Sequence, residues 1–144
     1  MSIPESERIK YEGNPLEQVE WYASILAEIE RSKSILTLED DWDGEGSSGY
    51  ELATWQRTTN YLKQNALRLW DSLHIALDTP NLSAGPDGSF DIDWKTDKRD
   101  LLINIPEDQT KLADFYGSNK AGQIVKGDLD ISNPNQWLLI WLMQ

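Results

Sequence analysis

The chain of 144 residues contains no cysteine, which excludes disulfides, thiolate nucleophiles and zinc–sulfur sites. It also lacks any apolar run near the roughly 20 residues that a membrane-spanning helix needs. The segment from Met1 to Glu7 has neither the basic nor the apolar part of a secretory signal. We therefore expect a soluble, cytoplasmic protein with no membrane association.

Basic residues are scarce as well, because 13 lysines and arginines stand against 25 aspartates and glutamates, a net charge of −12. Residues 1–51 hold 13 acidic and 4 basic side chains, whereas residues 52–144 hold 12 and 9. An acidic protein repels phosphate, so we expect no direct binding to nucleic-acid backbones. The charge favours solubility, or a basic protein partner reached by electrostatic steering.

Large aromatic residues are plentiful, with seven tryptophans, five tyrosines and two phenylalanines. Each of these rings buries roughly 150–250 Å², so the chain can build a core. Its length suits one domain, and we find no repeat and no linker that would divide it. We predict a polar N-terminal arm over residues 1–13 and a single α+β domain over residues 14–144.

The first half of the sequence predicts two helices joined by an acidic turn. Asn14-Pro15-Leu16-Glu17 is typical of a helix start, and this helix should run to about Leu36. Ser48-Gly49-Tyr50-Glu51 resembles a capping box in front of a second helix. Residues that are apolar except for Thr59 recur at spacings of three and four in both helices: Val19, Tyr22, Leu26 and Ile29, then Leu52, Trp55, Thr59, Leu62, Ala66, Leu69 and Leu73. The two helices should form a hairpin.

From Pro80 onward the apolar residues alternate with polar ones, which is typical of strands. Pro86-Asp87-Gly88 predicts a turn. We predict strands over residues 90–94, 101–105, 112–116 and 123–126. These strands should form a small antiparallel meander with the helical hairpin packed on one face.

The C-terminal segment Trp137-Leu138-Leu139-Ile140-Trp141-Leu142-Met143 is apolar on every side. Asn133 and Pro134 precede it as a cap and a first-turn proline, so we predict a short helix. A helix that is apolar all round must be buried all round. The sheet, the helical hairpin or another chain would bury it.

The segment Glu39-Asp40-Asp41-Trp42-Asp43-Gly44-Glu45-Gly46 is the densest cluster of carboxylates in the chain. Its spacing resembles the first half of a calcium-binding EF-hand loop, but Leu52 occupies the position of the bidentate glutamate. A tight turn explains the same residues, with the glycines at positive φ and Trp42 tucked between the helices. A hydrolase or metal-binding protein would use this loop, and an interaction module would present it to a partner.

Two further candidates for chemistry have simple structural explanations. Asp91 and Asp93 share one face of a strand, roughly 7 Å apart, and Lys98 and Arg99 are their expected cross-strand charge partners. His74, the single histidine, stands where the second helix ends and where its charge favours the helix terminus. Neither group predicts a catalytic site, and no nucleotide-binding or nucleophile motif is present.

A combination of motifs resembles a loose group of small, uncharacterised bacterial proteins. The motifs are Trp42-Asp43-Gly44-x-Gly46 between helices, Pro86-Asp87-Gly88, Phe90-x-Ile92-x-Trp94 and Tyr116-Gly117, over roughly residues 20–127. Ser47 and the Glu39–Asp41 acid run depart from the pattern. The resemblance implies the fold and a bacterial setting, and carries no catalytic residue. Antitoxins, immunity proteins and accessory subunits of defence complexes are similarly small and acidic.

Together these features predict a non-enzymatic protein–protein interaction module without a cofactor or metal. The expected partner is a basic protein, and the role is that of a bacterial accessory subunit or an antitoxin-like or immunity-like protein. The alternative is a metal-binding protein or hydrolase that uses the Glu39–Gly46 loop. The predicted partner-binding residues are Glu39, Asp40, Asp41, Trp42, Asp43, Glu45, Trp137 and Trp141.

Overall fold

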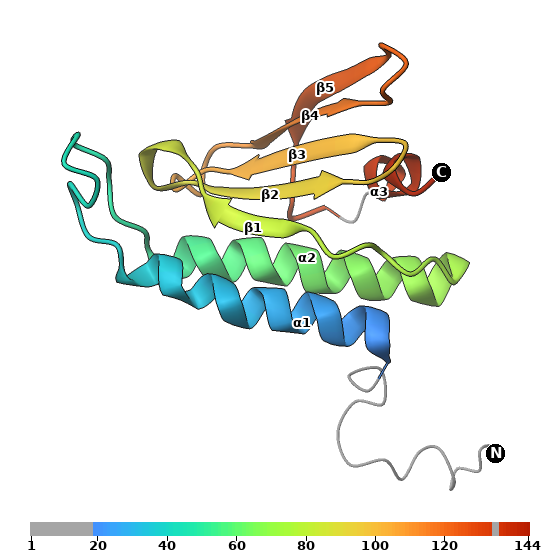
Figure 1. The fold of residues 1–144 in the computed structure, drawn as a ribbon, viewed down its shortest axis with the longest axis horizontal. Coiled ribbons are helices and arrows are strands. Elements are labelled where there is room, and N and C mark those ends of the chain that lie inside the picture. The colour runs from blue at the N-terminus through green and yellow to red at the C-terminus, as the bar shows by residue number, and fades with distance from the viewer. Residues whose placement is uncertain (1–18, 134–135) are drawn as a thin grey trace, which may run out of the picture.

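The structure, a computed structural model, describes residues 19–133 and 136–144 (Figure 1). The predicted N-terminal arm, the predicted helix start at Asn14–Glu17 and Pro134 lie outside the described residues. The α+β class is confirmed. Along the chain, the N-terminal helices come first, an antiparallel sheet follows, and a C-terminal helix comes after it. The helical elements are α1 (Glu20–Ser32), η3 (Lys33–Thr37), α2 (Leu52–Leu73), η4 (Pro86–Gly88) and α3 (Trp137–Leu142).

The sheet has five strands in the order in which they occur in the chain, and all neighbours are antiparallel. The strands are β1 (Asn81–Ala84), β2 (Phe90–Lys95), β3 (Asp100–Ile105), β4 (Ala113–Ser118) and β5 (Ile124–Leu129). The alternation in β2 and β3 was predicted correctly. Strand β1 was not predicted, and β4 and β5 end two and three residues later than expected.

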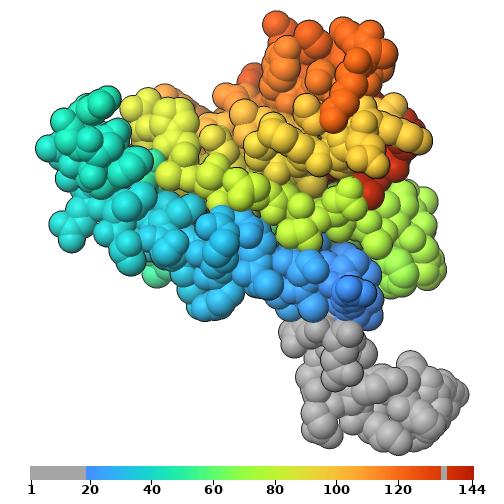
Figure 2. All heavy atoms as spheres, in the orientation of Figure 1, coloured from blue at the N-terminus to red at the C-terminus, as the bar shows by residue number. Residues whose placement is uncertain are grey.

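Helices α1 and α2 lie side by side beneath the sheet (Figure 1). Their buried side chains meet the inner face of the sheet in one core, which includes Ile25, Leu62, Ile92, Trp94 and Ile103. The other face of the sheet carries exposed side chains such as Leu102 and Tyr116. Figure 2 shows the loop before α2 and the β4–β5 hairpin standing out from different parts of the molecule.

Helix α2 departs from the predicted single stripe because it packs against both α1 and the strands β2 and β3. Thr59, Leu62, Ala66 and Leu69 are buried as expected, but Leu52 and Leu73 at its two ends are exposed. A second, polar set is buried beside them: Thr54, Thr58, Tyr61 and Asn65. The predicted capping box is wrong, since α2 begins after Glu51 and no side chain caps it.

Helix α3 packs against the inner face of the sheet at β4, where Trp137 meets Phe115 and Trp141 meets Gly117. Its residues Leu138, Leu139 and Leu142 are fully buried. A Cβ atom at Gly117 would lie 2.9 Å from the Trp141 ring, so only glycine lets the helix approach β4 this closely. Burial all round is wrong for this helix, because Trp137 is 46% exposed. A six-residue helix on a sheet keeps one side in solvent.

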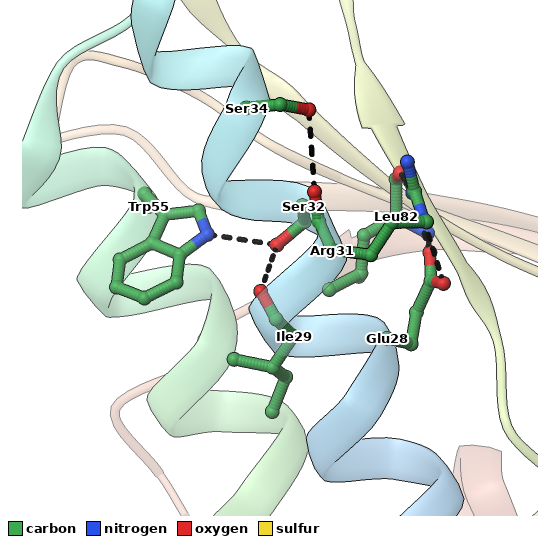
Figure 3. Close-up of polar contacts among 7 residues, drawn as sticks. All are labelled: Glu28, Ile29, Arg31, Ser32, Ser34, Trp55 and Leu82. Carbon is green, nitrogen blue, oxygen red and sulfur yellow. Dashed lines mark hydrogen bonds and ion pairs between the residues drawn. The ribbon is translucent and has the colours of Figure 1, made fainter.

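Polar contacts from α1 hold its position against β1 and α2 (Figure 3). Arg31 Nη2 donates to the Leu82 carbonyl at 2.6 Å, and the Leu82 amide donates to Glu28 Oε2 at 2.9 Å. Arg31 and Glu28 also bind each other, so the three residues form a closed set that we call the α1 clasp. On the other side of the helix, Trp55 Nε1 donates to the buried Ser32 hydroxyl at 2.8 Å. Both main-chain groups of Leu82 on the free edge of β1 are thereby satisfied.

Candidate functional site

The acidic loop, residues 38–51, connects η3 to α2 and projects from one end of the molecule (Figure 1). All five carboxylate residues predicted as partner-binding here are exposed: Glu39, Asp40, Asp41, Asp43 and Glu45. The loop therefore presents a dense group of negative charges to solvent.

Three of these carboxylates also hold the loop in shape. Asp40 Oδ1 accepts the Gly49 amide at 2.8 Å, and Asp41 Oδ1 accepts the Gly46 amide at 2.7 Å. Asp43 Oδ1 accepts the Glu45 amide at 2.9 Å. Hydrogen bonds from the Ser47 hydroxyl and from main-chain amides lower the pKa of Asp43, so this side chain stays ionised. The loop is thus organised by its own acids, as a local turn would be.

The backbone of the loop needs its glycines at the predicted places. Gly44 and Gly46 have φ of 75° and 84°, and this backbone conformation is unfavourable for residues that carry a Cβ atom. Asp41 adopts φ of 61° as well, a conformation that aspartate tolerates better than most residues. The expectation of glycines at positive φ is confirmed.

Trp42 does not tuck into the core between the helices, as expected from the turn interpretation, but is 42% exposed. Its Nε1 donates to the Ser48 carbonyl at 3.1 Å, and its ring lies 6.4 Å from that of Tyr50. The Tyr50 ring stands between the indole and the core, because it lies 5.5 Å from the buried Phe90 ring. Trp42 is therefore a partly exposed ring that is fixed in place among carboxylates.

The tertiary structure adds acids to this end that sequence distance hides. Glu51 lies beside Glu107, and burial followed by the negative charge of Glu51 raises the pKa of Glu107. Asp40 acts on Glu107 in the same direction, and Asp87 lies near Tyr50 together with Asp43. We call the whole set the acidic end: Glu39, Asp40, Asp41, Asp43, Glu45, Glu51, Asp87 and Glu107. No sequence signal links residues 87 and 107 to the loop, because only the fold brings the β1–β2 and β3–β4 connections to it.

The geometry of the loop does not build an EF-hand. Asp41 and Asp43 turn oxygens towards amides of the loop, and the position of the missing glutamate falls on Leu52 at the exposed start of α2. Glu51, one residue earlier, lies beside Glu107. Among residues 19–133 and 136–144, no three histidine, aspartate or glutamate side chains gather closely enough to hold a metal ion.

Asp91 and Asp93 do share the outer face of β2, but their predicted partners are wrong. Asp91 stands opposite Asn104, whose Nδ2 donates to Asp91 Oδ1 at 2.8 Å, and Asp93 binds Lys95 on its own strand. Partial burial raises the pKa of Asp91 more than this hydrogen bond lowers it, and Asp93 adds repulsion. Lys98 and Arg99 fall instead in and beside the β2–β3 turn, beyond the paired residues.

His74 terminates α2 in the left-handed conformation, with φ of 54°, and its ring lies 5.0 Å from that of Trp70. Its expected place at the helix terminus is confirmed.

Trp137 and Trp141 lie far from the acidic loop, because α3 and the loop occupy opposite ends of the long axis (Figure 1). Trp137 contacts the Phe115 ring edge-on at 5.8 Å, and the Arg99 guanidinium lies 5.2 Å from the Trp141 ring centroid. The predicted partner-binding residues thus lie on two separate surfaces. The residues of the loop form one compact surface, and Trp137 and Trp141 are not part of it.

Comparison with protein families, with curated proteins and with solved structures found no match for this chain. No helix in the described part of the chain is both long and apolar enough to cross a membrane.

Proposed function

We propose that the protein is a non-enzymatic interaction module whose acidic end binds a basic protein. Its role would be that of a bacterial accessory subunit, or of an antitoxin-like or immunity-like partner within a defence complex. The observation that carries this proposal is the geometry of the acidic loop, in which Asp40, Asp41 and Asp43 accept hydrogen bonds from main-chain amides and so fix the frame. The exposed carboxylates are thereby held in place before a partner arrives, which lowers the entropy cost of binding.

The position of Trp42 supports the same proposal. A tryptophan that is partly exposed, fixed by a hydrogen bond and surrounded by charge has the properties of an interface anchor. A basic surface would place cations on the carboxylates and also over the indole face, where cation–π attraction adds to the ion pairs. Glu51, Asp87 and Glu107 extend the area over which such a surface meets negative charge.

The experiment is affinity capture from the native host at low and high salt, followed by mass spectrometry. We expect a stoichiometric basic protein that elutes as ionic strength rises, because charge-steered binding is screened by salt. No captured protein at low salt would contradict the proposal. Retention that responds to a chelator and not to salt would favour the metal-binding alternative.

Variants make the assignment specific to the loop. Glu39 and Glu45 can lose their charge without loss of the frame, which depends on the three aspartates. The double variant Glu39→Gln/Glu45→Gln should reduce recovery of the partner at least about tenfold. The matched control is Asp71→Asn/Asp97→Asn, which removes two exposed charges elsewhere and should bind as the unmodified protein does.

A further inference from the structure

Strand β5 ends the sheet, and its outer edge is bare in the described structure. It pairs with β4 alone, and four of its six residues are exposed: Ile124, Lys126, Gly127 and Asp128. Within residues 19–133 and 136–144, no side chain binds its main chain in the way that the α1 clasp binds Leu82 on β1. The β4–β5 hairpin also stands out from the body of the molecule (Figure 2). An edge of this kind is a template for another strand.

The register of the hairpin shows which residues turn their main-chain groups outward. The Asn119 amide donates to the Gln123 carbonyl at 3.1 Å, so these two residues form a hydrogen-bonded pair. Bonded and non-bonded pairs alternate along an antiparallel ladder. Because Ser118 faces Ile124 and Tyr116 faces Lys126, the outward groups belong to Ile124, Lys126 and Asp128.

We propose that β5 pairs antiparallel with β5 of a second copy of this chain across a twofold axis. Gly127 would lie on the axis, with Lys126 opposite the partner's Asp128 and Asp128 opposite the partner's Lys126. Both charged residues carry outward main-chain groups, so each pair also exchanges two main-chain hydrogen bonds. The result is a continuous sheet that contains the five strands of each copy.

The sequence of β5 is complementary to itself in this register alone. A shift that places Lys126 on the axis opposes lysine with lysine, and a shift to Asp128 opposes aspartate with aspartate. On the inner face, Val125 would stand opposite the partner's Leu129, so apolar side chains meet where the core already lies. Gly127 has no side chain to crowd the partner's Gly127 at the axis, where the Cα atoms of a non-hydrogen-bonded pair lie about 4.5 Å apart. Charge and burial therefore favour the same pairing.

The net charge of −12 opposes self-association in general, but it is distributed away from this edge. Residues 111–130 hold three basic and three acidic side chains, which makes the surroundings of β5 neutral. The acidic loop lies at the opposite side of the view from β5 (Figure 1). A second copy therefore meets little repulsion here, whereas a strongly basic strand would gain little attraction. Two short strands bury a small area, so the dimer should be reversible and dependent on concentration.

Sedimentation velocity over a concentration series tests the pairing with a charge swap. The variants Lys126→Asp and Asp128→Lys each place like charges opposite each other, and each should weaken dimerisation at least about tenfold. The double variant Lys126→Asp/Asp128→Lys restores opposite charges and should dimerise as the unmodified chain does. Lys111→Asp is the matched control, because it changes the net charge as Lys126→Asp does and lies outside the strand.

A monomer at the highest soluble concentration would overturn the proposal, as would single variants that dimerise normally or a double variant that does not recover. Amide hydrogen exchange locates the interface without substitution. The Ile124, Lys126 and Asp128 amides should gain protection as concentration rises, while the Leu82 amide, already bound to Glu28, should not change. Protection that appears on another surface, or on binding a different protein only, would also reject the pairing. Circular dichroism confirms that each variant is folded.

Discussion

The two edge strands of the sheet differ, because α1 covers the outer edge of β1 and the outer edge of β5 is open in the described residues. On β1, Glu28 and Arg31 bind the amide and the carbonyl of Leu82, so α1 occupies that edge. On β5, no side chain in the described residues binds the outward main-chain groups. Lys126 and Asp128 lie two residues apart on this open strand. An isolated charge on an edge discourages pairing, but a lysine and an aspartate two residues apart permit it when the incoming strand is the same sequence. One edge is closed by a helix, and the other selects its partner by charge.

The two halves of the sheet also differ in the elements that support them. Strand β1 contacts α1, and the central strands β2 and β3 contact α2, whereas β4 contacts the short helix α3 through Phe115 and Gly117. Strand β5 is therefore held through its pairing with β4 and through the core, because no described residue binds its outer edge. Three measurements would break or sharpen this comparison.

The largest effect should come from removal of the support under the open half. Leu139 is 0% exposed, so Leu139→Ala leaves a cavity beneath the sheet and should cost about 2–5 kcal/mol in the free energy of unfolding. Urea denaturation measures the loss. The control is Leu73→Ala, at a leucine that is 49% exposed, which should change stability by less than about 0.5 kcal/mol. Equal losses for the two variants would show that α3 is not part of the core.

A smaller effect should follow when the closed edge is opened. Arg31→Met removes the donor to the Leu82 carbonyl and the partner of Glu28, and should cost about 1–3 kcal/mol. Lys33→Met is the control, because Lys33 binds Glu30 at 3.0 Å between two exposed side chains and such pairs contribute about 0–1 kcal/mol. If the two variants lost the same stability in urea, the clasp would be no more than a surface ion pair.

The smallest effect is the pH dependence of the clasp. The hydrogen bond from Arg31 is the main cause that lowers the pKa of Glu28 below its ordinary value of 4.5. A lowered pKa of an acid stabilises the folded protein fully above the ordinary value, and this contribution disappears as pH falls through the lowered value. The stability difference between the unmodified protein and Glu28→Gln should therefore shrink on acidification from about pH 7 to about pH 3.

The difference between the two proteins is the quantity to follow, since other acids shift the other way. Burial raises the pKa of Asp91 and of Glu107, so these groups favour the folded state at low pH. Both are present in each protein, and their contribution cancels in the difference. A difference that stays constant over this range would contradict the role of the ionised Glu28.

Local patterns in the sequence were enough to predict part of this structure. The alternation of Phe90, Ile92 and Trp94 predicted which face of β2 is buried, because side chains alternate between the faces of a strand. The glycines of the acidic loop predicted its positive φ angles. In contrast, β1 has only four residues, and its short pattern is too weak to separate a strand from a loop.

The candidate site was predicted in its local part and missed in its tertiary part. The loop carboxylates and Trp42 form a contiguous segment, so their common surface follows from the chain itself. Glu51 and Glu107 lie beside each other because of the fold, and no local signal connects them. Trp137 and Trp141 were predicted to bind the partner together with the loop, and the structure places them in α3, at the other end of the molecule.

The sequence by itself determined the α+β class, the excess of negative charge, the acidic turn and the period of the central strands, because each depends on residues close together in the chain. The tertiary structure alone decided which tryptophans are exposed, which acids converge and which edge of the sheet is closed. These features depend on contacts such as that between Glu28 and Leu82, which lie 54 positions apart. Contacts between residues so far apart in the sequence follow from the packing of whole helices and strands. A periodic pattern within one element does not predict how that element packs against another.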